Sequence, residues 1–284
     1  GANAGSVTFS GTTNINDAVN FTAASQTLTF KGDTSLDDGI NLKGFASTLI
    51  LDSTPGNKTF TAVISTEGDN TGTLQVKGAN TYTIANAVGA NGDALSSVTI
   101  ADSSNATFSS SVYANSLTVG SGTTTFNANV TGALALGSTG STVAFGDGVT
   151  MTGAITNSSG AATGTINASG DFTATSTIGD SGNGAISTFN VGADNKVIAF
   201  NNDAYITTFA FGGNAGSSLV LSDGKKLTGN ITAGGSSKGI IDASTNSATV
   251  DGNIGGSGAS VANIKIGTAN AAKVFTASGD VYST

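Results

Sequence analysis

The sequence contains no cysteine, no histidine and no tryptophan, and Pro55 is its single proline. Glu67 is the only glutamate, and all ten Lys and Arg residues are lysine. Without histidine or cysteine the chain cannot build a Ser–His or Cys–His nucleophilic pair, an HExxH zinc site or a thiolate-ligated zinc site. These absences exclude the commonest hydrolytic and zinc-dependent chemistries.

Positive charge is scarce, because the chain has ten lysines and 18 acidic residues, which gives a net charge of −8. Lys225 and Lys226 form the only adjacent basic pair. Nucleic-acid binding requires a basic face that neutralises phosphates, and an acidic membrane surface repels an acidic chain. No apolar run reaches the roughly 18 residues of a membrane-spanning helix. We therefore expect no nucleic-acid partner and no direct membrane span.

Candidate sites for chemistry are few. The phosphate-binding pattern GxxxxGK[ST] is absent, and the carboxylates that lie near each other in sequence are Asp37 with Asp38 and Glu67 with Asp69. A glycosidase needs two carboxylates at a defined separation, but we interpret these four as turn residues that face solvent. Calcium-binding EF-hand loops and repeated GGxGxD motifs are missing, which leaves a structural calcium ion on isolated turn aspartates as an open alternative. We expect no catalytic, no cofactor-binding and no metal-ligating residue.

What the chain does contain is a series of short apolar–polar–apolar triplets, such as Val7–Phe9, Leu28–Phe30, Tyr82–Ile84 and Val98–Ile100. Alternation with a period of two places both apolar side chains on one face of a strand. Clusters of Gly, Asn, Asp and Ser separate the triplets, and these residues tolerate the positive φ of tight turns. The pattern predicts an all-β chain of short strands.

An internal repeat covers most of the chain, with copies near 47–100, 141–192 and 217–267. Four short blocks recur in the same order. They read TAVI, TGAI and TGNI; then TGTL, TGTI and KGII; then Val-Gly, Ile-Gly and Ile-Gly; and finally LSSVTI, ISTFNV and VANIKI. Equivalent residues lie 90 to 92 positions apart between copies one and two, and 75 or 76 apart between copies two and three.

The unequal spacing favours a right-handed parallel β-solenoid, since a stacked solenoid can absorb extra residues as part of an additional coil. Tandem β-sandwich domains are the alternative, but they would need the extra length in a linker, and the intervening residues 116–130 are patterned like strands. Coils of about 20–25 residues would give roughly 11–14 rungs. We expect N-terminal rungs over 1–46, continuous with a repeat-containing solenoid over 47–284.

The repeat core TGTLQVKGANTYTIANAVGANGDALSSVTI at 71–100 resembles the passenger repeats of rickettsial-type outer membrane protein B and A autotransporters, the surface cell antigen family. The segment ATFSSSVYANSLTVG at 106–120 is in the same style, and the resemblance covers about 47–284. It implies a passenger that is exported through a C-terminal β-barrel to the surface of a Gram-negative cell.

The chain departs from that family at both ends. Its start, GANAGSVTF, is not a signal peptide, and its end, FTASGDVYST, contains no series of barrel strands and stops inside a repeat. We interpret the sequence as a mature segment of a longer precursor, whose anchoring stays open.

The expected function is that of a non-catalytic, extracellular structural or adhesive protein in a bacterial cell-surface coat or host-contact surface. The alternative is a self-assembling extracellular fibre or S-layer subunit, because the ends of a solenoid present open strand edges. A polysaccharide-active enzyme is the third class. The expected partners are further copies of the chain, in end-to-end or lateral assembly, or molecules on host or neighbouring cells.

Overall fold

The computed structural model describes residues 5–160, 162–182, 184–268 and 272–284, and all regular structure in these residues is β-strand. Contacts group the chain into two compact units, Gly1–Val143 and Ala144–Thr284. Both are parallel β-solenoids, with about 12 turns (called coils below) in total. The all-β solenoid predicted from the sequence is confirmed, and tandem sandwiches are not what the chain forms.

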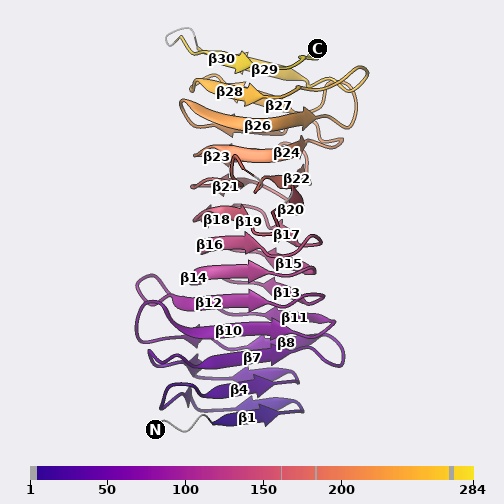
Figure 1. The fold of residues 1–284 in the computed structure, drawn as a ribbon. Helices are drawn as coiled ribbons and strands as arrows, with labels where there is room; N and C mark the ends of the chain where they lie inside the picture. The colour runs from indigo at the N-terminus through magenta and orange to yellow at the C-terminus, as the bar shows by residue number, and fades with distance from the viewer. Residues whose placement is uncertain (1–4, 161, 183, 269–271) are drawn as a thin grey trace. The chain divides into compact units, whose positions relative to one another are not determined.

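In the first unit each early coil contributes one strand to each of three parallel sheets (Figure 1). The strands of the first sheet, in spatial order, are β1 (Ser6–Phe9), β4 (Thr27–Phe30), β7 (Thr48–Asp52), β10 (Thr71–Lys77), β12 (Leu95–Ile100), β14 (Val112–Val119) and β16 (Val130–Leu136). Those of the second are β2 (Thr13–Ile15), β5 (Thr34–Leu36), β8 (Lys58–Thr61), β11 (Thr81–Ile84), β13 (Asn105–Phe108), β15 (Thr123–Phe126) and β17 (Thr142–Phe145), the last of which contains the division between the units. The third sheet holds β3 (Val19–Asn20), β6 (Ile40–Asn41) and β9 (Ile64–Ser65).

In the second unit the paired strands form two long rows. One row of paired strands is β18 (Val149–Thr152), β21 (Phe172–Ala174), β23 (Val197–Phe200), β25 (Ser218–Leu221), β27 (Ile240–Ala243) and β29 (Asn263–Ile266). The other is β20 (Thr163–Ala168), β22 (Ile186–Val191), β24 (Ala204–Ala210), β26 (Lys225–Thr232), β28 (Ala248–Asp251) and β30 (Phe275–Ala277). The short β19 (Ile155–Asn157) follows β18.

The core consists of apolar side chains stacked in columns along each unit. In the first unit, Leu49, Leu74, Val98, Leu117 and Leu134 occupy successive coils in register, and all five are fully buried. Burying one such side chain contributes about 1.5–3 kcal/mol, so stability accumulates from contacts between neighbouring coils.

The expected boundary between the N-terminal rungs (1–46) and the repeat-containing part (47–284) does not interrupt the first unit. β7 lies after this position and β4 before it, and the two pair in parallel from Thr27 with Thr48 to Phe30 with Leu51. The coils on either side of residue 46 thus belong to one ladder.

Two of the columns in the second unit show which faces of the coils the repeat occupies. One contains Ile155, Ile178, Ala204, Leu227 and Val250; another contains Ile166, Phe189, Phe209, Ile231 and Ile254. Ile155 and Ile231 are equivalent residues of copies two and three, yet they stand in different columns. Copy three is therefore rotated by one face of the solenoid relative to copy two.

The T-G-x-I block explains why the chain can turn a corner within one strand. In Thr228-Gly229-Asn230-Ile231, Gly229 has φ +136°, and a Cβ there would collide with the carbonyl oxygen of Ile206 on the preceding coil. Gly153 of copy two has a similar φ of +126°. Side chains disfavour this region, so copies two and three require glycine at the second position of the block, whereas copy one has the buried Ala62 there.

Candidate functional site

The carboxylates singled out in the sequence lie at turns and are exposed. Asp37 and Asp38 occupy the turn between β5 and β6. Glu67 forms an ion pair with Lys43, and that hydrogen bond lowers the pKa of the Glu67 carboxyl. The Asp69 carboxylate instead accepts a hydrogen bond of 3.1 Å from the backbone N–H of Ala94. Glu67 and Asp69 are thus engaged by different partners.

The described part of the chain contains no group of three or more His, Cys, Asp or Glu side chains placed to hold a metal ion. Within the same residues, no helix is long and apolar enough to cross a membrane.

Most turn carboxylates and many turn amides serve as links between coils. The Oδ1 atom of an Asp or Asn on one coil accepts a hydrogen bond from a backbone N–H on the next. The donors and acceptors are Thr59 to Asp33, Thr81 to Asn57, Ser121 to Asp102, Thr123 to Asn105, Asp171 to Asp147, Val197 to Asp171, Ala215 to Asp194, Ser247 to Asp223, Asn253 to Asn230 and Asp280 to Asn253.

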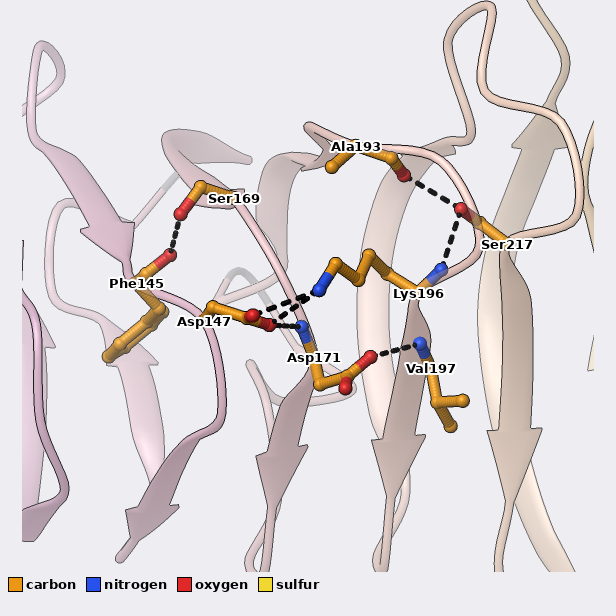
Figure 2. Close-up of polar contacts among 8 residues, drawn as sticks. All are labelled: Phe145, Asp147, Ser169, Asp171, Ala193, Lys196, Val197 and Ser217. Atoms are coloured by element: carbon orange, nitrogen blue, oxygen red, sulfur yellow. Dashed lines mark hydrogen bonds and ion pairs between the residues drawn. The ribbon is translucent and has the colours of Figure 1, made fainter.

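Figure 2 shows the most complete of these ladders, which spans three coils at one edge of the second unit. Asp147 accepts from the N–H of Asp171 at 2.7 Å, and Asp171 accepts from the N–H of Val197 at 2.8 Å. The Lys196 ammonium reaches back across the middle coil to both oxygens of Asp147, each at 2.9 Å. Its hydrogen bond lowers the pKa of the Asp147 carboxyl and, in return, raises that of the Lys196 ammonium.

The same combination of an aspartate, a backbone N–H donor and a lysine ammonium recurs one repeat later. Asp223 accepts from the N–H of Ser247 at 2.7 Å, and the Lys273 ammonium lies 3.2 Å from Asp223. These Asp and Lys side chains therefore link neighbouring coils at their edges, which is a structural role.

A second recurrent feature is a glycine loop at a corner of the solenoid. Gly89, Gly179 and Gly255 follow the column residues Val88, Ile178 and Ile254, and their φ values are +67°, +66° and +69°. In each copy a tyrosine lies on the next coil, and its backbone N–H donates to the carbonyl of the column residue. The donors are Tyr113, Tyr205 and Tyr282, and the distances are 2.8, 2.7 and 2.8 Å.

The corner of copy two carries a surface cavity of about 280 Å³. Three successive coils line it, because the loop after Gly179, the start of β24 and the middle of β26 meet there. Its lining residues are Asp180, Ser181, Gly182, Ala185, Tyr205, Thr207, Thr228, Gly229 and Asn230. We call this cavity the Tyr205 groove.

The polar atoms around the groove are only partly engaged. Asp180 Oδ1 accepts from the N–H groups of Gly182 at 2.8 Å and Gly184 at 3.3 Å, which holds the carboxylate at the rim. The Thr228 hydroxyl oxygen is buried and has no hydrogen-bond partner among the described residues. Among the described residues that line the groove, Asp180 is the only one with an ionisable carboxylate.

Sequence reasoning did not single out Asp180 or Tyr205. Asp180 belongs to one of the many Gly, Asn, Asp and Ser clusters that the sequence predicts as turns, and nothing in the local pattern distinguishes it from the others. The available signal was the recurrence of a Val-Tyr or Ala-Tyr pair after each Val-Gly or Ile-Gly block. Three of the chain's four tyrosines stand at this place.

Comparisons of the chain with family models, with curated proteins and with solved structures gave no match in any of the three. The resemblance to autotransporter passengers thus stays a prediction from the sequence.

Proposed function

We propose that the chain is a non-catalytic structural or adhesive protein of a bacterial cell surface, and that its outer faces work as extended contact surfaces. The observation that carries this proposal is the composition of the outward-facing columns. They are built from small hydroxyl and amide side chains, in register from coil to coil.

One such column in the first unit consists of Thr73, Ser97 and Ser116, and the Thr73 and Ser97 hydroxyls lie 3.2 Å apart. In the second unit, Asn167 and Asn190 stand in register, and the Asn190 amide donates to Asn167 Oδ1 at 2.9 Å. Uncharged hydrogen-bonding groups at regular spacing can meet another polar surface without burying unpaired charge, which would be costly. Flat faces of this kind suit contact over a wide area.

The charged residues support the same proposal. Six lysines form ion pairs with acidic residues on other coils, so they strengthen the solenoid. Stabilisation spread over many coil-to-coil links suits a coat protein, which must persist outside the cell without disulfide bonds.

Labelling of intact cells tests the proposed location. Antibodies against this chain should bind Gram-negative cells that produce the full-length protein before any permeabilisation. Labelling that appears only after the envelope is opened would overturn the proposal.

Adhesion is tested by coating beads with the chain and counting those that attach to cultured epithelial cells. An acidic protein of similar net charge on the same beads is the control for non-specific attachment. Attachment above the control supports the adhesive role, whereas attachment equal to the control would leave only the coat role.

Self-assembly into a fibre or lattice is the second candidate, and the first described coil favours it. A cavity of about 290 Å³ there is lined mainly by apolar side chains, among them Val7, Phe9, Val19, Phe21 and Leu28. Val7 is 54% exposed. A further parallel coil, supplied by another copy, would cover these side chains and pair with β1.

Sedimentation and electron microscopy distinguish a self-assembling subunit from a monomeric surface protein. Assembly predicts concentration-dependent species longer than the monomer, which Val7→Lys should abolish because it places a charge at the junction. Val197→Lys, at a 45% exposed strand residue in the second unit, is the matched control. Monomers at all concentrations would contradict end-to-end assembly.

A further inference from the structure

The three copies of the repeat retain a residue that the fold does not require. The glycine of each corner loop is needed for its positive φ, and the Val or Ile before it fills a core column. The side chain of the tyrosine on the next coil neither supports a positive φ nor fills a core column. Tyr113 and Tyr205 point outward from their strands and are half-exposed, and Tyr282 is 41% exposed. Any strand-favouring residue would serve the backbone at that position.

In copy two this tyrosine lines the Tyr205 groove together with groups that can hydrogen-bond a ligand. Asp180 stands at the rim, and its Oδ2 has no hydrogen-bond partner among the described residues. The Oδ1 atom of Asn230 accepts from the N–H of Asn253 at 2.9 Å, which fixes the plane of the amide. The unpartnered Thr228 hydroxyl lies in the same wall.

We propose that the Tyr205 groove binds a single neutral sugar residue of a glycan. A sugar ring has an apolar C–H face and a rim of hydroxyl groups. An aromatic ring complements the face, and a carboxylate with a neighbouring amide complements the hydroxyls. This inference deepens the adhesive role proposed above and rests on it for its biological meaning.

The size and charge of the groove select this class of ligand. Its volume of about 280 Å³ falls just below the range of pockets for drug-sized molecules, which suits one ring better than a long oligosaccharide. The lining residues carry a carboxylate and no cation, which disfavours phosphates and acidic sugars. The Lys226 ammonium lies over one face of the Tyr205 ring, 5.8 Å from its centroid, and its charge is shared with the Asp251 carboxylate at 3.9 Å. The sugar would stack on the opposite face of the ring.

The other corners lack part of the site. Ala90 and Gly256 occupy the positions equivalent to Asp180, so neither of the other corners has a carboxylate at that place. The loop of copy one has its carboxylate three residues further on, at Asp93, which pairs with Ala90 through backbone hydrogen bonds. Copy two is therefore the copy that should bind, and Tyr113 provides a matched control within the same chain.

The test is an NMR titration of the 284-residue chain with the methyl glycosides of N-acetylglucosamine, glucose, galactose and mannose. At least one should cause saturable shifts of the Gly182, Thr207 and Asn230 amide signals, with a millimolar Kd. Tyr205→Ala and Asp180→Asn should each weaken binding about tenfold or more. Tyr113→Ala should leave the Kd unchanged, and Tyr205→Phe should largely preserve it because the ring remains.

Absence of saturable shifts with all four glycosides would overturn the proposal, as would equal binding by the wild type and Tyr205→Ala. The bead assay separates this failure from that of the proposed function. Beads that adhere equally with and without Tyr205 support the adhesive role and count against the groove as its basis. Saturable sugar binding by a chain whose beads do not adhere supports the groove and counts against adhesion.

Discussion

The carbonyl oxygen of Tyr205 lies 2.5 Å from the point where a Cβ at Gly179 would sit. The two residues are on neighbouring coils, and their backbones approach because Tyr205 donates its N–H to the carbonyl of Ile178. Gly255 and Tyr282 have the same relationship at 2.7 Å. The glycine loop and the tyrosine are thus one structural unit in each copy.

Substitution of Gly179 by alanine should destabilise the second unit by about 2–4 kcal/mol. The φ of +66° strains any L side chain, and the new methyl group meets a backbone carbonyl that cannot move without breaking its ladder. The midpoint of urea unfolding measures the effect. Gly224→Ala is the control, because Gly224 has φ +72° but open space around it, and it should lose only about 1 kcal/mol. Equal losses at the two positions would show that the contact with Tyr205 does not matter.

The side-chain ladder between coils predicts a difference between two substitutions of Asp171. Asp171→Ala removes the acceptor for the Val197 N–H and should cost about 1 kcal/mol. Asp171→Asn retains an Oδ1 acceptor, as Asn57 and Asn105 do naturally, and should stay close to wild type. Chemical unfolding of both variants checks this, and an asparagine variant as unstable as the alanine variant would refute the ladder's role.

Acid should weaken the coil edges before it affects the core. The pKa values of Asp147 and Asp102 are lowered in the folded chain, chiefly by hydrogen bonds from Lys196 and Ser138 respectively. A lowered pKa contributes stability that is present above the unfolded value of 3.8 and is lost as the pH falls through the folded value. The thermal midpoint should therefore fall steadily below about pH 4.

Asp147→Asn isolates this effect, because it removes the titrating group while retaining an acceptor for Asp171. It should lower the midpoint near neutral pH and make no difference in strong acid. A variant whose deficit persisted at all pH values would point to a loss unrelated to charge.

Tyr82 should ionise separately in an alkaline titration. Burial raises the pKa of its phenol to about 12, and its hydroxyl donates to the carbonyl of Gly32 at 2.7 Å. A raised pKa contributes stability that is complete below the unfolded value of 10.0 and is lost as the pH rises through about 12. Ultraviolet absorbance of the phenolate should show a component near pH 12 that Tyr82→Phe removes. If that variant retained the component, Tyr82 would not be its source.

Several parts of the fold could be predicted from the sequence because they depend on local patterns. Triplets such as Tyr82–Ile84 form strands, since alternation determines which side chains face inward. The offsets of the repeat indicated stacked coils, since only a solenoid accommodates an irregular spacing without a linker. Glycine clusters marked the turns for the same local reason.

The groove could not be predicted in this way. Asp180, Tyr205 and Asn230 are far apart in sequence, and they meet because three coils stack in register at one corner. Register across coils depends on the length of every intervening turn, which local patterns do not determine. The tyrosine that recurs in each copy was the one available signal. Its place in the groove could be inferred only once the residues on the adjacent coils were known.

The rotation of copy three by one face has a consequence for how such a chain can change in length. If recombination removed the residues between Ile155 and Ile231, the apolar columns would still join, because each face accepts the same kinds of side chain. Everything after the junction would, however, face a new direction. Gain or loss of a copy would thus redirect the exposed corners around the axis of this unit while preserving the interior that holds it together.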